Sequence, residues 1–210
     1  MSGAAFHEAM WSQRYREVGD DYLFGTAPNG YLARHVGLFA SCQAVLCVAD
    51  GEGRNSVWLA ERGFVVTATD ISEVALEKAR KLAAARGVTV SARKADILSS
   101  DWPVAAFDAV VAIFIQFAGP VEREVLFRRM KDAVRPGGVL LVQGYTPKQI
   151  EYRTGGPSAV ENLYTEAWLR RCLADWAILR IDEYEDELSE GSGHCGRSAL
   201  IGVVARRPAG

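Results

Sequence analysis

Residues 45–55 read VLCVADGEGRN, and this stretch decides the fold. Its first five residues, 45–49, are apolar and do not alternate with polar ones, which is typical of a parallel strand buried on both faces. The turn DGEG at 50–53 follows, and residues 54–60 then read as a helix. Glycines at such a turn let the backbone approach a ligand closely, because they have no Cβ. Together with the unpaired N–H groups at the helix start, the turn predicts a ligand site at the end of this strand.

A second β-rich run, 64–70, ends in Asp70, 19 positions after Gly51. A carboxylate at the tip of a second strand can accept hydrogen bonds from both ribose hydroxyls, so this order of elements predicts a nucleoside site. A dinucleotide fingerprint would need a third glycine where Ser56 stands, and a P-loop would need Gly-Lys followed by Ser or Thr. Glu52 would place a negative charge against a pyrophosphate. The stretch therefore favours a ligand with a ribose and no phosphate, such as S-adenosylmethionine (SAM).

The stretch VLCVADGEGRNSVWLAERGFVVTATDIS resembles the SAM-binding core of class I methyltransferases, and it is most similar to the small bacterial group of TehB-like and thiopurine methyltransferases. WSQRYREVGDDYLFGTAPNGYL, FDAVVAIF, RPGGVLLVQGYTP, TGGP and the late His-x-Gly at 194–196 resemble one subgroup, in the same order along nearly the whole chain. The resemblance implies an α/β, Rossmann-like fold. The expected sheet has seven mostly parallel strands in the order 3-2-1-4-5-7-6, a C-terminal antiparallel hairpin, and helices on both faces.

The resemblance also implies which residues bind the cofactor: Val48, Ala49, Asp50, Gly51, Gly53, Arg54, Asp70, Ile71, Asp96, Ile97 and Phe114. In this family an acid at the position of Asp96 contacts the adenine amino group, and the next residue packs on the ring. The alternative for Asp96 is a loop aspartate that makes turn hydrogen bonds. The chain departs from the family pattern at four positions. Cys47 stands for the usual first acid, Ala49 for the first glycine, Gln116 for a frequent His and Gln143 for a frequent Glu.

Composition limits the classes of function. The chain has 210 residues, 49% of them hydrophobic, and a net charge of −2. These values suit a single domain and give no general attraction to nucleic acid or to an anionic membrane. No apolar run approaches the roughly 18 residues of a membrane span, and the four cysteines show no C-x-x-C spacing. We expect a cytoplasmic monomer or homodimer with a small-molecule substrate and no metal site.

Residues 1–40 are expected to form a helical extension that caps the site, and residues 41–210 the SAM-binding core. Helices are predicted at 6–18 and 30–40, with His7 at the surface. The aromatic residues of the extension either pack it on the domain or close over the ligands, since an aromatic face suits a sulfonium cation. Candidates for contact with the substrate near this end are Trp11, Tyr22 and Phe24, together with Phe117 after the fourth strand.

Residues 144–162 have few periodic features and follow the carboxyl end of the fifth strand. An irregular segment of this length is either functional or disordered. We read it as a substrate lid, with Tyr145, Tyr152 and Arg153 as possible contacts.

Residues 176–188 and 198–206 read as strands with no helix between them, so they must pair as an antiparallel hairpin. The loop 189–197 would then join them at the site edge. His194 in this loop is either a solvent-exposed histidine or a functional one. The acids between 182 and 190 are expected on a solvated edge, and the alternative is that they favour a cationic substrate or a partner.

We expect a SAM-dependent methyltransferase that works mainly by alignment and exclusion of water. The product would be S-adenosylhomocysteine (SAH), and the catalytic candidates are Gln116, Tyr145 and His194. The sequence shows no obvious assignment of a general base, which favours a soft or anionic acceptor such as a thiol or a tellurite- or selenite-like oxyanion. Two alternatives stay open. They are a SAM-binding module without catalysis and an NAD-dependent oxidoreductase, which Ser56 and the terminal hairpin disfavour.

Overall fold

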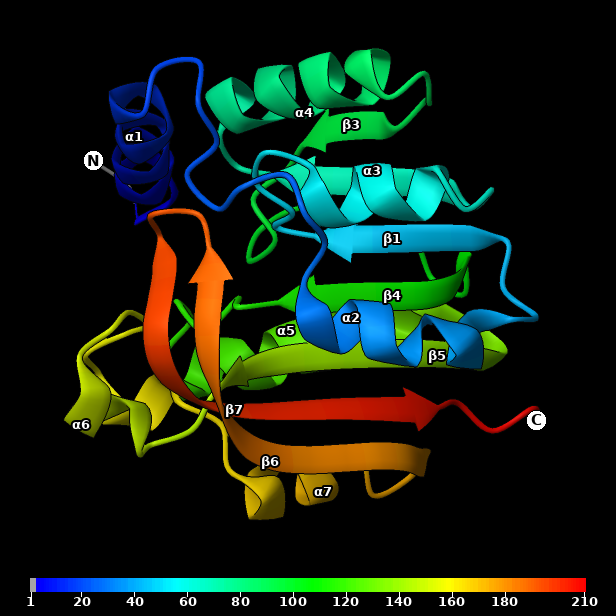
Figure 1. Ribbon diagram of the computed structural model, residues 1–210. Helices are drawn as coiled ribbons and strands as arrows, with labels where there is room; N and C mark the ends of the chain where they lie inside the picture. Colours follow the sequence, from blue (N-terminus) through cyan, green and yellow to red (C-terminus); the bar gives the residue numbers. More distant parts are fainter. Residues whose placement is uncertain (1–2) are drawn as a thin grey trace.

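The computed structural model describes residues 3–210, so Met1 and Ser2 of the predicted extension lie outside the described residues. The apolar run before the DGEG turn forms one strand of a seven-stranded sheet in the order β3-β2-β1-β4-β5-β7-β6, which confirms the predicted order (Figure 1). The strands are β1 (Ala44–Val48), β2 (Val65–Asp70), β3 (Ser91–Lys94), β4 (Phe107–Ile113), β5 (Val134–Tyr145), β6 (Ala177–Glu190) and β7 (His194–Arg206).

Strands β1 to β5 pair in parallel, whereas β7 pairs antiparallel with both β5 and β6. The register places Val45 opposite Ala109 of β4, and Gln143 of β5 opposite Gly202 of β7. A parallel neighbour would need a crossover of a dozen or more residues, and the chain between β6 and β7 is far too short for one. The predicted C-terminal antiparallel hairpin is therefore confirmed.

Helices cover both faces of the sheet (Figure 1). They are α1 (Gly3–Glu17), α2 (Gly30–His35), the 3₁₀ helix η1 (Val36–Phe39), α3 (Arg54–Ala60), α4 (Glu73–Ala85), α5 (Pro120–Ala133), α6 (Gln149–Tyr152), the 3₁₀ helix η2 (Val160–Asn162) and α7 (Glu166–Cys172). The predicted helix at 30–40 is thus α2 followed by a tighter 3₁₀ turn. Across residues 3–210, none of these helices has the length and apolarity needed to span a membrane.

Each face of the sheet has its own hydrophobic core, because successive strand residues point to opposite sides. Leu46 of β1 packs with Phe127 and Met130 of α5 in one core. Its neighbour Val45 packs with Leu32 of α2 in the other. Because β1 and β4 are buried on both faces, polar side chains at these strands are confined to the strand ends.

A buried ion pair attaches the N-terminal extension to the core. The ammonium group of Lys78 donates to the carbonyls of Tyr15 and Asp21, at 2.8 and 2.7 Å, and to Glu52 Oε1 at 2.9 Å. The other carboxylate oxygen of Glu52 accepts the N–H of Leu23 at 2.7 Å. Since a buried charge needs a partner, Glu52 turns toward the extension and not toward a ligand. The predicted repulsion between Glu52 and a pyrophosphate is therefore wrong.

The tip of the β6–β7 hairpin is tighter than the predicted loop 189–197, because only residues 191–193 lie between the strands. The prediction is wrong here because the polar sequence SEGSGHCG lacks the alternation by which strands are recognised. The tip packs on the extension, where the N–H of Gly193 donates to the carbonyl of Leu23 at 2.9 Å. His194 is accordingly the first residue of β7 and not a loop residue.

The predicted lid after β5 is a packed segment that includes two short helices, α6 and η2. The buried side chain of Gln149 accepts the N–H of Ala199 at 2.8 Å and donates to the carbonyl of Gly155 at 3.1 Å. The hydroxyl of Thr154 donates to the carbonyl of Arg197 at 2.5 Å. These bonds hold the segment against β7.

Candidate functional site

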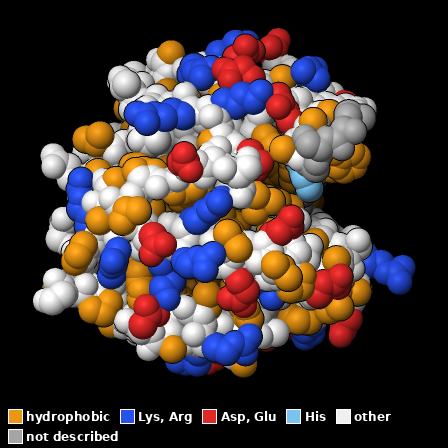
Figure 2. Space-filling model, turned by 180° about the vertical axis from the view of Figure 1, so that it is seen from behind, with side chains coloured by type: hydrophobic (Ala, Val, Ile, Leu, Met, Phe, Trp, Pro, Cys, Tyr) orange, Lys and Arg blue, Asp and Glu red, His pale blue; other side chains and the backbone are white. Residues whose placement is uncertain are grey.

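A cavity opens at the carboxyl ends of β1, β2 and β4, between α1 and the tip of the β6–β7 hairpin. Figure 2 shows a notch at this edge of the molecule, with a histidine inside it. Ligands of open parallel sheets bind at this edge. Ten of the eleven residues predicted to bind the cofactor line the cavity: Val48, Ala49, Asp50, Gly51, Arg54, Asp70, Ile71, Asp96, Ile97 and Phe114.

Two neighbouring strands end in strained backbone at the cavity. Ala49 after β1 and Phe114 after β4 have φ values of 46° and 56°, in the left-handed region that side chains other than glycine rarely adopt. The family that the sequence resembles has a glycine at the position of Ala49, and the backbone of Ala49 has the left-handed conformation that favours glycine. Such strain is commonly found at functional sites, and here it directs the chain around the cavity.

Gly53 is the predicted cofactor residue that does not line the cavity. Its φ is 89°, and a Cβ at this position would lie 2.7 Å from the Cβ of Ala79 on α4. The glycine therefore allows α3 to begin in close contact with α4.

Two carboxylates face the cavity, Asp50 after β1 and the buried Asp70 at the end of β2. Burial raises the pKa of Asp50 to about 7, although hydrogen bonds from Ser56 lower it. Burial also raises the pKa of Asp70 to about 6, opposed by the N–H groups of Ser72 and Gly51, which donate to it at 2.8 and 2.9 Å. A positively charged or hydroxyl-bearing ligand would favour the ionised form of both groups.

Asp96 follows β3 and lines the cavity beside Ile97. Its carboxylate accepts the N–H of Leu98 at 3.0 Å and the hydroxyl of Ser99 at 2.6 Å. The turn hydrogen bonds of the alternative interpretation are thus present, and they hold Asp96 at the cavity edge.

Aromatic side chains form the wall of the cavity on the side of the extension. Trp11 stacks on Tyr15 at a ring distance of 6.0 Å, and Tyr15 meets Phe24 edge to face at 6.3 Å. Phe117 lies 6.1 Å from the ring of His7. All five side chains line the cavity. Trp11 and Phe24 therefore both pack the extension on the domain and face the site.

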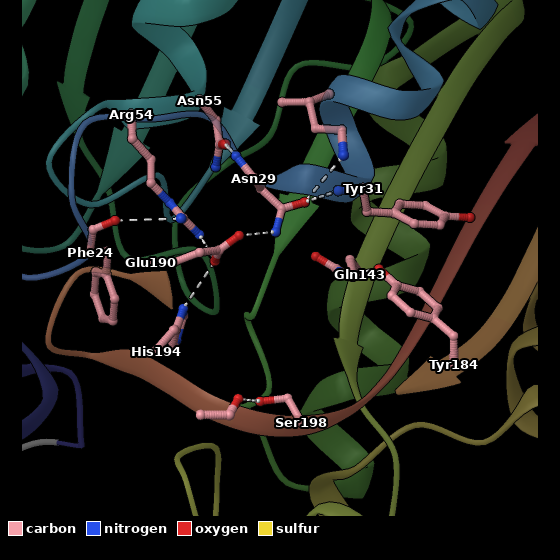
Figure 3. A network of polar contacts seen from close by, with 12 residues as sticks. Phe24, Asn29, Tyr31, Arg54, Asn55, Gln143, Tyr184, Glu190, His194 and Ser198 are labelled. Atoms are coloured by element: carbon pink, nitrogen blue, oxygen red, sulfur yellow. Dashed lines mark hydrogen bonds and ion pairs between the residues drawn. The ribbon is translucent and has the colours of Figure 1, made fainter. Parts of the chain in front are cut away.

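Figure 3 shows a polar network at the hairpin tip. Arg54 Nη2 donates to Glu190 Oε2 at 2.7 Å, and Asn29 Nδ2 donates to Glu190 Oε1 at 3.1 Å. Burial raises the pKa of Glu190, but the neighbouring imidazole of His194 and the charge and hydrogen bond of Arg54 outweigh it and lower the pKa to about 2. The prediction of a solvated acidic edge is wrong for Glu190, and the guanidinium of Arg54 is already paired.

His194 lines the cavity, and its side chain is only 11% exposed. Its ring lies 4.3 Å from that of Phe114 and 4.5 Å from that of Phe24. Burial lowers its pKa below the usual value, and Glu190 partly opposes this change. The structure thus rules out the solvent-exposed loop histidine.

Three candidates for substrate contact lie away from the cavity. The hydroxyl of Tyr22 donates to the carbonyl of Lys78 at 3.4 Å. Tyr152 donates to Glu185 Oε2 at 2.7 Å, on the outer side of the packed segment. Arg153 is exposed, with a φ of 55°. Of the predicted substrate-contact residues, Trp11, Phe24 and Phe117 are the ones that the fold brings to the cavity.

Two catalytic candidates also lie outside the cavity lining. Gln116 Nε2 donates to the carbonyl of Tyr145 at 2.9 Å, and Gln116 Oε1 accepts the N–H of Tyr145 at 2.5 Å. Tyr145 stacks on Phe114 at 4.6 Å, behind the cavity wall. Its buried hydroxyl has no hydrogen-bond partner among residues 3–210. Of the three candidates, His194 is the one that reaches the cavity.

Sequence reasoning placed His7 at the surface, and it left Tyr15 among the aromatic residues of the extension without assigning it to the site. The two residues flank Trp11 at a spacing of four, so all three share one face of α1. That spacing was a usable signal, but the placement of the helix depends on distant contacts such as the 2.6 Å ion pair between Glu8 and Lys94. The surface prediction for His7 is wrong because this face turns toward the cavity.

Within the described part of the chain, no group of three or more His, Cys, Asp or Glu side chains could hold a metal ion.

Comparisons with known proteins agree with this geometry. Residues 45–138 match the sequence model of a methyltransferase domain. An uncharacterized protein of Mycobacterium tuberculosis is 29% identical over 147 residues, which cover 68% of this chain and 51% of that protein. The chain therefore spans about half the length of these curated relatives.

Two solved structures share the fold. TehB from Haemophilus influenzae has a TM-score of 0.71 at 21% identity, over 95% of this chain and 66% of that one. The N-methyltransferase NodS from Bradyrhizobium japonicum, in complex with SAH, has a TM-score of 0.70 at 15% identity, over 96% and 98% of the two chains. At these identities the likeness concerns the fold, which is the Rossmann-like class I methyltransferase fold.

Asp50→Asn is expected to reduce the dependence of stability on pH. Because burial raises the pKa of Asp50 to about 7, the folded protein keeps a proton that the unfolded chain has released above about pH 4. Wild-type protein should therefore lose stability as the pH rises through this window, on the order of 1.4 kcal/mol for each unit of pKa difference. The asparagine cannot titrate and avoids this loss.

Urea denaturation at pH 5 and pH 8 measures the change. From pH 5 to pH 8, the free energy of unfolding of Asp50→Asn should increase relative to that of wild type. The exposed control Asp101→Asn should show no such trend. A pH-independent difference between Asp50→Asn and wild type would mean that Asp50 ionises normally.

Proposed function

We propose that this protein, whose residues 45–138 match a methyltransferase domain, is SAM-dependent and transfers the methyl group of SAM to an uncharged small molecule with an S–H or O–H group. The observation that carries the proposal is the position of His194, which lines the same cavity as the predicted cofactor residues. The acceptor and the cofactor would meet at this side chain.

The cavity residues fit SAM. Asp70 ends β2 with a buried carboxylate that would accept hydrogen bonds from the ribose, and Asp96 with Ile97 would hold the adenine. Of the described residues that line the cavity, only Arg54 carries a fixed positive charge, and Glu190 already pairs with it. Such a site suits a cationic ligand without phosphates. When bound, SAM supplies a methyl group on a positively charged sulfur and leaves as the neutral thioether SAH.

The same charges favour an uncharged acceptor. An oxyanion would be desolvated near Asp50 and Asp70, with no unpaired cation among the described lining residues to replace its water. A tellurite- or selenite-like oxyanion, which the sequence left open, therefore fits this cavity less well than a neutral thiol or phenol. The aromatic wall would hold the apolar body of such a molecule.

His194 would act as the general base. Burial lowers its pKa, so the ring is uncharged near neutral pH and can take the proton of the acceptor. The rings of Phe24 and Phe114 pack against the imidazole and limit its contact with water. The acceptor would keep the electron pair on its sulfur or oxygen and become the nucleophile.

The two rival functions are less well supported. A SAM-binding module without catalysis was suggested by the departures at Gln116 and Gln143, but both side chains make structural hydrogen bonds, Gln143 to the hydroxyl of Tyr184 at 2.7 Å. The placement of His194 favours catalysis over this alternative. An NAD-dependent oxidoreductase of the dinucleotide-binding type would have a parallel sheet without the antiparallel β7.

Asp70→Asn tests the cofactor site. Loss of a charge-assisted contact to the ribose should weaken the binding of SAH by about 1.5 to 3 kcal/mol. Calorimetric titration with SAH measures this, with NADH as a ligand that wild-type protein should not bind. Circular dichroism reports whether the variant is folded, and Asp101→Asn is the matched control. If folded Asp70→Asn bound SAH as tightly as wild type, the cofactor would have to bind elsewhere.

His194→Ala tests the base. A positioned general base contributes about 10²- to 10⁴-fold, and only when the acceptor carries a proton. The variant should therefore lose most activity with alkyl thiols and phenols, and much less with acidic aromatic thiols that are ionised at the assay pH. The rate of SAH formation across this panel is the measurement, and His35→Ala is the control. An equal loss with every acceptor would exclude a role as base.

A further inference from the structure

We propose that Glu190 is a positioning residue of this site: its carboxylate orients His194 and selects the tautomer of its ring, while Arg54 and Asn29 hold the carboxylate in place. The inference rests on the proposed methyl transfer, in which His194 is the base. Glu190 itself does not line the cavity and would act only through His194.

The hairpin sets the distance between the two side chains. Glu190 and His194 lie opposite each other at the ends of β6 and β7, and Glu190 Oε2 is 3.6 Å from His194 Nδ1. Both side chains are largely shielded from solvent, at 12% and 11% exposed. His194 Nδ1 has no hydrogen-bond partner within the described residues, although buried polar atoms normally have one. Catalytic hydrogen bonds are often long in the absence of ligands, and a small movement of the two side chains toward each other would form a hydrogen bond between Nδ1 and Glu190 Oε2.

Donors from two other elements hold the carboxylate. Arg54, the first residue of α3, binds the same Oε2 atom at 2.7 Å, and Asn29 before α2 binds Oε1 at 3.1 Å (Figure 3). Asn29 is held in turn, because its Oδ1 accepts the N–H groups of Tyr31 and Leu32 at 3.0 and 3.1 Å. The carboxylate therefore has little freedom to rotate away from His194.

Arg54 also connects the network to the cofactor loop. It follows the DGEG turn directly and lines the cavity. The loop predicted to hold SAM and the carboxylate that orients the base thus share one buried ion pair.

A carboxylate facing Nδ1 selects the tautomer that carries the proton there, which leaves the lone pair of Nε2 free. The proton of the acceptor would move to Nε2, and Glu190 would remain ionised and stabilise the imidazolium. The charged and titratable groups that act on or face the His194 ring are Glu190, Arg54, Arg14 and Tyr145. Glu190 raises the pKa of His194, whereas burial and the two arginines lower it.

Glu190→Gln tests the proposal, since glutamine keeps the shape and one oxygen but removes the charge. With an alkyl thiol acceptor, kcat should fall about 10- to 100-fold while the KM for SAM stays within about twofold. Without the anion His194 binds its proton less tightly, so the acid limb of the pH–rate profile should move to lower pH. Glu187→Gln, at an exposed acid of the same strand, should change neither.

An active Glu190→Gln variant with an unchanged pH–rate profile would overturn the role of Glu190 and leave the proposed function intact. Wild-type protein that transferred no methyl group to any thiol or phenol would contradict the proposed function instead.

A second measurement tests the proposal on the wild-type protein and needs no activity assay. The chain has three histidines, so the ring nitrogens of His194 can be assigned by ¹⁵N NMR spectroscopy. At pH 7.5 wild-type protein should show His194 with its proton on Nδ1. A proton on Nε2 would overturn the proposal, whether or not Glu190→Gln folds.

Discussion

The burial of β1 and β4 on both faces is the constraint on which the rest of the structure depends. Neither strand can carry polar side chains along its length, because both faces pack against helices. Polar groups are therefore gathered where the strands end, and parallel strands end at the same edge. Asp50 and Asp70 meet there, next to the strained turns at Ala49 and Phe114. The cavity and its negative charge follow from this arrangement of the sheet.

Two buried ion pairs complete the cavity with segments from the two ends of the chain. Lys78–Glu52 attaches the extension, and Arg54–Glu190 attaches the hairpin tip. A buried ion pair adds little net stability, since desolvation offsets most of the attraction, but breaking one leaves an unpaired charge and costs much more. We infer that both pairs serve mainly to hold these segments in one position over the cavity.

The fold and the way in which most of the predicted cofactor residues gather at one cavity could be predicted because their signals are local. The strand, turn and helix around 45–60 and the acid at the end of β2 each depend on a few neighbouring residues. The hairpin followed from the lack of any helix before the last strand. The side chains that close the cavity could not be predicted in this way. His7 reaches it only because α1 docks across the sheet edge, and Glu190 is buried only because the hairpin tip meets the extension.

Similar reasoning explains the candidates that lie elsewhere. Tyr22 and Trp11 are both aromatic residues of the extension, and sequence alone gives no reason to separate them. Tyr22 lies toward α4, where its hydroxyl reaches the carbonyl of Lys78, while Trp11 faces the cavity. Gln116 and Tyr145 follow strands that end at the site, but they bond to each other behind its wall. Strand ends identify the edge of the sheet, and tertiary packing decides which side chains face the ligand.

A crystal structure of the protein with SAH bound would test most directly whether this cavity is the cofactor site. We expect electron density for the adenosine between Asp70 and Asp96, with the sulfur toward Phe114 and His194. Density for SAH outside the cavity, or with its sulfur turned away from His194, would contradict this account of the site.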